Sequence, residues 1–204
     1  MSNIHTSKMT GKLEGLTAIS TNTITNSFCI KMNGSNKKNQ ICTKCYSHTM
    51  LKSYRKNMQP CLERNSQLLS SSILPMDELP SLLVLYIRIN AHGELINRNH
   101  FVNIINIAIK NPNTNVVLWT KRKNLVIKTL EEIGKPDNLI LIYSNPIISN
   151  ILYVRPKFFD KTFNNVLENE NITEQNCTGQ KCKDCLLCYT FNDTTTIVEK
   201  VKKY

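Results

Sequence analysis

The sequence contains no unbroken apolar stretch long enough to span a bilayer, and its first ten residues carry no apolar signal core. These two absences predict a chain that has no membrane partner and is not secreted. The sequence also has no internal repeat, which argues against a solenoid. We therefore expect a protein that stays in the reducing cytoplasm.

Acidic residues are few, with 15 Asp and Glu against 26 Lys and Arg, and the resulting net charge is +11 with a pI near 9.3. A basic surface of this kind favours contact with nucleic acid or another anionic partner. A solvated, lysine-rich surface without any such partner explains the same composition. The charge alone does not choose between the two.

Eight cysteines are unusual for a chain kept in a reducing compartment, where disulfides are rare and clustered cysteines are more often metal ligands. Four of them follow the pattern C-x4-C-x2-C-x2-C, at Cys177, Cys182, Cys185 and Cys188. Thiolates select zinc or iron–sulfur clusters over hard cations. The overlapping C-x2-C steps are closer to ferredoxin usage, and a structural zinc knuckle is the alternative.

A second cysteine set lies near the N-terminus, at Cys29, Cys42 and Cys45, with Cys29 placed at the end of a predicted first strand. Three ligands without a fourth leave one coordination position open, as in metal sites that perform chemistry. Cys61 is the one further thiol that could close the site. Its neighbours have helical apolar spacing, so we favour a small buried residue there.

Alternating strand and helix patterns occupy the middle of the chain. Continuous apolar runs predict buried strands at residues 82–90, 116–120 and 139–143. Helical spacing predicts helices at 99–110 and 124–133, the second closed by a glycine C-cap. Strand–helix repeats with short connections indicate parallel pairing through right-handed crossovers.

The rest of the chain completes the predicted fold. Residues 15–30 predict a strand or hairpin, and residues 46–73 a helical stretch interrupted near Pro60. We therefore predict an α/β protein with a small open parallel sheet, or a partial (β/α) barrel, of about four strands. Residues 1–155 would form this domain with the N-terminal cysteine site, and residues 156–204 a cysteine-rich, metal-binding segment packed on it.

Several polar residues directly follow or end the predicted strands. In parallel α/β folds, ligands gather at the carboxyl ends of the strands. The candidate cofactor-binding residues are His92, Gly93, Glu94, Thr120, Lys121 and Ser144. A plain turn residue explains His92 equally well, and a helix N-terminal carboxylate explains Glu94.

The order of these motifs over residues 16–143 resembles the radical S-adenosylmethionine superfamily. That superfamily carries three cluster cysteines, spaced CxxxCxxC, after its first strand and a Gly-Gly-Glu-Pro motif after its second. Cys29, Cys42 and Cys45 match the first, with twelve residues between Cys29 and Cys42, and Ala91-His92-Gly93-Glu94-Leu95 matches the second. The resemblance implies a [4Fe–4S] cluster that binds S-adenosylmethionine, whose amino group the second motif would hold.

Most of the chain more closely resembles the phage gene product 88 family. The matching motifs are Cys45-Tyr46, Arg88-Ile89-Asn90-Ala91-His92-Gly93-Glu94, Trp119-Thr120-Lys121 and Cys182-x2-Cys185-x2-Cys188. Together, the resemblances imply an iron–sulfur protein with one or two clusters, a radical-SAM-like enzyme of open substrate, in the host cytoplasm. The alternative is a structural zinc or iron–sulfur protein that binds nucleic acid or senses redox state.

Overall fold

A computed structural model describes residues 3–37 and 39–201, and within them seven strands form one sheet in the order β1-β2-β3-β4-β5-β6-β7. β1 pairs antiparallel with β2, and every later pairing is parallel. Strand order therefore follows chain order, as in a barrel, but the sheet stays open between β1 and β7. The strands are β1 (Ser7–Lys8), β2 (Thr17–Ile19), β3 (Tyr86–Ile89), β4 (Asn115–Thr120), β5 (Leu139–Ser144), β6 (Lys161–Leu167) and β7 (Thr196–Val201).

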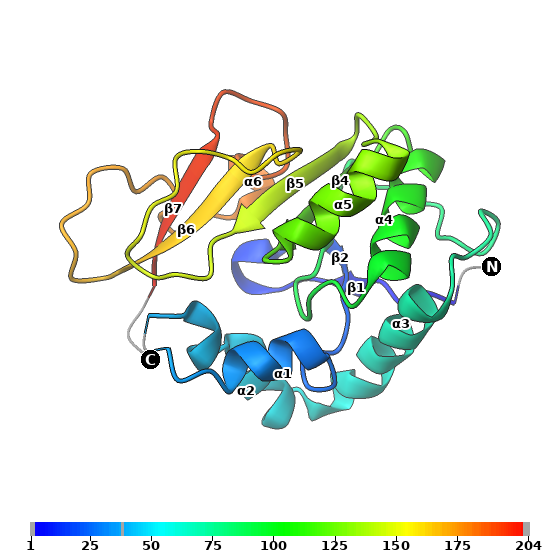
Figure 1. Ribbon diagram of the computed structural model, residues 1–204, viewed down its shortest axis with the longest axis horizontal. Helices are drawn as coiled ribbons and strands as arrows, with labels where there is room; N and C mark the ends of the chain where they lie inside the picture. The colour runs from blue at the N-terminus through cyan, green and yellow to red at the C-terminus, as the bar shows by residue number, and fades with distance from the viewer. Residues whose placement is uncertain (1–2, 38, 202–204) are drawn as a thin grey trace.

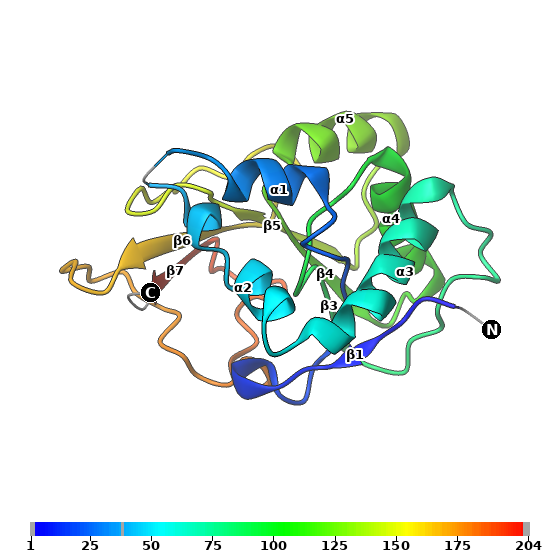
Figure 2. The same cartoon turned by 90° about the horizontal axis from the view of Figure 1, so that it is seen from below.

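Helices lie on both sides of this sheet. In Figure 1, α4 and α5 lie in front of the sheet, α6 lies behind it, and α1 and α2 lie along its lower edge; in Figure 2, seen from below, α1 and α2 face the viewer. No described helix is long and apolar enough to cross a membrane. The α-helices are α1 (Ser27–Asn33), α2 (Tyr46–Lys52), α3 (Gln59–Ser71), α4 (Arg98–Lys110), α5 (Lys123–Ile133) and α6 (Cys182–Cys185), and the 3-10 helices are η1 (Gly11–Leu13), η2 (Ile41–Lys44) and η3 (Lys56–Met58).

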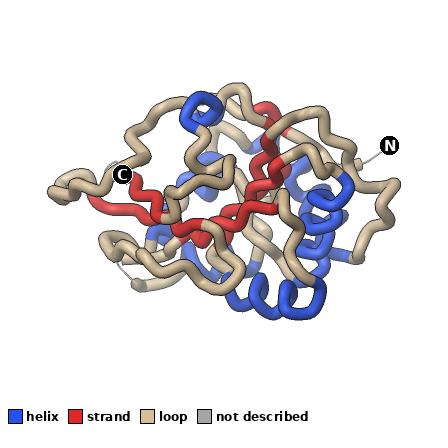
Figure 3. Tube along the Cα trace, turned by 90° about the horizontal axis from the view of Figure 1, so that it is seen from above, coloured by secondary structure: helices blue, strands red, loops and turns tan. Residues whose placement is uncertain are grey.

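The two faces of the sheet carry separate apolar clusters. The larger cluster packs one face of the sheet against α3, α4 and α5, and includes Ile87, Ile89 and Phe101. The smaller cluster joins Val117 and Trp119 of β4 to Tyr189, which comes from the C-terminal cysteine segment. That segment therefore covers the inner face of the sheet, the face opposite to α3, α4 and α5. Figure 3 shows the longer helices on one side of the strands and loops with a short helix on the other.

The α/β class and the open, mostly parallel sheet are confirmed, as are the helices at α4 and α5 and the glycine that ends α5. Gly134 has φ +79°, which suits a glycine C-cap. The expected number of strands is wrong, since seven are present rather than four. β6 escaped prediction because Lys161, Asn164 and Asn165 are buried polar residues that break the apolar pattern of a central strand.

The predicted position of Cys29 at the end of a strand is also wrong. β2 ends at Ile19, and Cys29 lies in the first turn of α1. Asn26 caps this helix, because its side-chain oxygen accepts hydrogen bonds from the backbone N–H groups of Phe28 and Cys29. The Thr-rich composition favoured a strand, but this cap determines the local structure.

Two further boundaries differ from the sequence prediction. β3 covers only the last part of the apolar run at 82–90, and Leu83 and Leu85 are exposed. The helical stretch breaks at residues 53–58 rather than at Pro60, which lies in the first turn of α3. Proline suits that position, because the first turn needs no backbone N–H donor.

Candidate functional site

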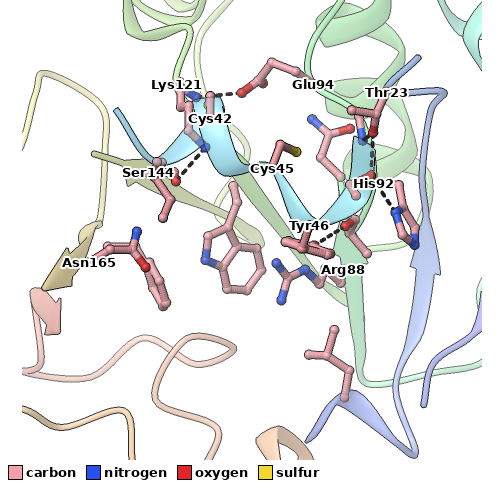
Figure 4. Close-up of a pocket in the computed structure, with 18 of the residues that line it drawn as sticks. Thr23, Cys42, Cys45, Tyr46, Arg88, His92, Glu94, Lys121, Ser144 and Asn165 are labelled. Carbon is pink, nitrogen blue, oxygen red and sulfur yellow. Dashed lines mark hydrogen bonds between the residues drawn. The ribbon is translucent and has the colours of Figure 1, made fainter. Parts of the chain in front are cut away.

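A cavity of about 450 Å³ opens at the carboxyl ends of the parallel strands (Figure 4). This volume lies within the usual range for small-molecule sites. The helices that follow β2, the ends of β3 to β6 and the C-terminal cysteine segment all contribute to its wall. Of the predicted site residues, it is lined by Cys29, Cys42, Cys45, Cys177, Cys182, Cys188, His92, Gly93, Glu94, Lys121 and Ser144.

The three N-terminal cysteines reach this cavity from three consecutive short elements. Cys29 lies on α1, Cys42 lies in η2 and Cys45 precedes α2. α1 and η2 are held together because the amide of Asn33 donates a hydrogen bond of 2.9 Å to the carbonyl of Cys42. The twelve residues between Cys29 and Cys42 therefore form a helix and a loop that return the chain to the same cavity.

The positive charge of Lys121 acts on the thiols of this cysteine set. Its Nζ donates a hydrogen bond of 3.0 Å to Oγ of Ser144 (Figure 4). Burial lowers the pKa of Lys121, but Cys42, Glu94 and the two other thiols together outweigh burial and raise it. Burial raises the pKa of Cys42, and the charge of Lys121 opposes that rise. The N-terminal cysteines thus share one buried counter-charge.

The four C-terminal cysteines line a second, much smaller cavity of about 20 Å³ beside the first. Cys185, which does not line the large cavity, faces this one, and its Sγ accepts a hydrogen bond of 3.3 Å from Gln180. Burial raises the pKa of Cys188 to about 12. Lys12, from η1, donates hydrogen bonds to Cys177 and Glu199 and so joins this segment to the N-terminal part of the chain.

Donor chemistry and geometry give different answers about metal binding. Across residues 3–37 and 39–201, no three His, Cys, Asp or Glu side chains are grouped closely enough to hold a metal ion. The donors do fit a soft metal centre, because thiolates are the ligands that such centres prefer. The members of each cysteine set also line a common cavity. Cys61 does not line either cavity, and its Sγ donates to the carbonyl of Met58 at 3.0 Å.

The loop after β3 is held in place by the carboxylate of Glu94. Its Oε1 accepts hydrogen bonds from Thr120 Oγ1 at 2.5 Å and from the backbone N–H of Leu95, and its Oε2 accepts one from the backbone N–H of Lys121 at 2.8 Å. Glu94 therefore links the ends of β3 and β4. Thr120 does not line the cavity, and its contribution is the hydrogen bond that holds Glu94.

A chain of hydrogen bonds fixes His92 beside the cavity. Its Nδ1 lies 2.7 Å from the hydroxyl of Ser47, which lies 2.6 Å from the hydroxyl of Thr23 (Figure 4). Burial, with the nearby charges of Arg55 and Arg88, lowers the pKa of His92 to about 4. The imidazole is thus neutral near pH 7 and binds to neighbours rather than supplying a charge.

Sequence analysis missed a number of lining residues as site residues, among them Arg88, Asn90 and Tyr189. The guanidinium of Arg88 projects into the cavity (Figure 4), with its Cζ 4.2 Å from the centroid of the Trp119 ring. An arginine within an otherwise apolar strand was the available signal, because a buried strand excludes charge unless it has a use.

The fold and the cavity together define an α/β protein with a cavity at the carboxyl end of an open, mostly parallel sheet. A family model described as gene product 88 matches residues 5–190, and the chain therefore belongs to the gene product 88 family. The expected relationship to that family is confirmed, whereas nothing in these comparisons extends it to the radical S-adenosylmethionine superfamily. No curated protein and no solved structure matches the chain.

Proposed function

We propose that this protein is an iron–sulfur protein with a [4Fe–4S] cluster on Cys29, Cys42 and Cys45 at the open end of the sheet. One observation carries the proposal. Thiols from the two ends of the chain, about 130 residues apart in sequence, line a single cavity at the carboxyl ends of the parallel strands. Apolar packing alone gives no reason for six cysteines to gather at the site where α/β proteins bind ligands.

The N-terminal set favours a cluster over a single zinc ion. Thiolates bound to one zinc must each approach it to about 2.3 Å, which gathers them tightly. In an iron–sulfur cluster, the thiolates bind different irons at separate corners, so they are held farther apart. Cys29, Cys42 and Cys45 line a cavity of about 450 Å³, which has room for a cluster as well as a small molecule.

The C-terminal set has different surroundings. Its four thiols line a small cavity of about 20 Å³ that has no space for a substrate, and three of them also line the large cavity. We propose that these thiols hold a centre that stabilises the fold. An auxiliary cluster and a structural zinc both suit four thiolates. The ratio of iron to zinc in the purified protein distinguishes them.

The chemistry that we propose is of the radical S-adenosylmethionine type, in which cluster and cofactor together supply one-electron chemistry when bound. The chain's own residues would position the reactants. Lys121 balances the negative charge of the thiolates, Gly93 permits close approach to the backbone, and Ser144 orients Lys121. Glu94 already accepts three hydrogen bonds, so a cofactor amino group would be an additional partner.

The first test is metal analysis of protein purified without oxygen, together with its absorption spectrum. We expect iron and sulfide, with broad absorbance near ~400 nm. Cys42→Ser should lose the N-terminal cluster, whereas the matched variant Cys61→Ser should keep wild-type iron because Cys61 lies outside both cavities. Equal iron in the two variants, or zinc without iron, would contradict the cluster.

A second test addresses the enzyme. The reduced protein should cleave S-adenosylmethionine to 5′-deoxyadenosine, and Cys42→Ser should not. If the wild-type protein carries iron but forms no 5′-deoxyadenosine and shows no spectral change on adding S-adenosylmethionine, the protein binds clusters for another purpose, such as redox sensing.

A further inference from the structure

The inner wall of the large cavity contains buried polar atoms that make no hydrogen bond of good geometry to the described part of the chain. Among the described residues, six buried side-chain N and O atoms lack a hydrogen bond, and four of them belong to Arg88, Asn90 and Tyr189. All three residues line the cavity. A buried polar group left unpaired costs about 1–3 kcal/mol, so such a group requires an explanation.

These atoms are buried by the fold and face a common space. Tyr189 is 1% exposed and Asn90 is 7% exposed, yet the hydroxyl of one and both amide atoms of the other are unpartnered. Asn90 also has φ +60°, a left-handed conformation that asparagine tolerates better than most other non-glycine residues.

Arg88 brings a positive charge that no carboxylate pairs with among the described residues, since it takes part in none of their salt bridges. Its Nε is buried and has no hydrogen-bond partner, and its guanidinium contacts the Trp119 ring. The Cys182 and Cys188 thiols and Tyr189 lie near enough to interact with its charge. An anion that enters the cavity would be a further partner for this half-buried cation.

Arg88 lies at a different depth in the cavity from the expected cofactor site. Arg88 pairs with Val117 in the middle of the sheet, on the inner face, since its neighbours Ile87 and Ile89 pack on the other face. The loop at residues 91–95, which the superfamily resemblance assigns to the cofactor, follows the end of the strand. Arg88 therefore lies deeper, where a substrate would extend.

We propose that the cavity binds a small organic anion, whose carboxylate or phosphate group is held by Arg88, Asn90 and Tyr189 and whose apolar body lies against Trp119. A planar guanidinium suits both groups, because it binds two oxygens at once. The anion site is argued from the cavity itself, and only the description of the anion as a substrate rests on the proposed function.

Trp119 provides the measurement, because it is the single tryptophan of the chain and contacts Arg88. Benzoate and phenyl phosphate serve as probes, and benzyl alcohol as the neutral analogue. We expect one of the two anions to change the fluorescence of Trp119 in a saturable manner, with no such change for the alcohol. The responding anion identifies the carboxylate or the phosphate class.

Matched substitutions locate the binding site. Arg88→Met should weaken anion binding about tenfold to a hundredfold, the usual effect of losing a hydrogen bond to a charged group. Arg98→Met should leave binding unchanged, since Arg98 lies on the surface in a pair with Glu132. Tyr189→Phe should weaken binding, because it removes the hydroxyl that we propose donates to the anion and keeps the ring that packs against Trp119.

The outcomes separate this inference from the cluster proposal. If wild-type protein responds to neither anion, or if Arg88→Met and Tyr189→Phe bind as tightly as wild type, the anion site is refuted whatever the iron content. If the anion binds and Arg88→Met abolishes the response in a protein without iron, the anion site stands and the cluster proposal fails. If Arg88→Met does not fold, Tyr189→Phe and Arg88→Lys provide the same comparison.

Discussion

At the scale of single residues, the site depends on close backbone contacts as much as on the cysteines. Gly93 donates its backbone N–H to the hydroxyl of Thr23 at 2.8 Å. An added Cβ at Gly93 would lie 2.2 Å from Oγ1 of Thr21 and 2.6 Å from its carbonyl oxygen. The loops after β2 and β3 thus approach each other too closely for any side chain at this position.

Gly93→Ala tests this contact. The substitution combines a positive φ of +81° with a collision against backbone, and we expect it to lower the free energy of unfolding by about 3 kcal/mol or more. Gly134→Ala is the matched control, because Gly134 has φ +79° with nothing within 4 Å of the added Cβ. It should cost about 1 kcal/mol. Equal losses in urea unfolding would mean that Thr21 moves aside at little cost.

At the scale of elements, α4 carries a titratable group in the apolar layer. His100 is fully buried, and its Nδ1 accepts a hydrogen bond of 3.1 Å from the backbone N–H of Ile96. Burial, with the charge of Arg122, lowers the pKa of His100 to about 3. The unfolded chain, with a pKa near 6.5, therefore binds one more proton than the folded chain between those two values.

The stability that neutral His100 gives is fully present above about pH 6.5 and is lost as pH falls towards 3. We expect the free energy of unfolding to fall by about 2 kcal/mol between pH 7.5 and pH 5 through protonation of His100 in the unfolded chain. His100→Asn keeps an acceptor for Ile96 but cannot titrate, so urea unfolding of this variant should depend less on pH by that amount. An identical pH dependence in variant and wild type would mean that protonated His100 is accommodated.

The elements also show how far sequence patterns reach. The apolar periodicity of α4 and α5 determines their position, so both were predictable. Cys29 was misplaced because one side-chain cap, at Asn26, overrides a Thr-rich composition. Arg88 was missed because nothing in the sequence says that its side chain projects into the cavity. Cysteine spacing predicts that the members of each set lie near one another, whereas the cavity that the two sets share depends on how the chain returns through β6 and β7.

At the scale of the whole molecule, the sheet runs without interruption across the expected boundary near residue 155. β6 pairs with β5 on one side and with β7 on the other. The cysteine segment between β6 and β7 then covers the inner face, where Tyr189 lies 5.4 Å from the Trp119 ring, centroid to centroid. The two ends of the chain thus share one core, and we expect them to unfold together.

Cooperative unfolding can be measured with two probes in the same protein. Trp119 fluorescence reports on the contact with the C-terminal segment, and far-UV circular dichroism reports mainly on the helices of the opposite face. We expect coincident transitions in urea, as for a two-state domain.

Tyr189→Ala should lower the free energy of unfolding by about 3–5 kcal/mol, as truncation of a buried aromatic does, and should move both transitions together. Tyr54→Ala, on the exposed surface, should move neither. If Tyr189→Ala shifts the fluorescence transition alone, the C-terminal segment is a separable cover over the cavity.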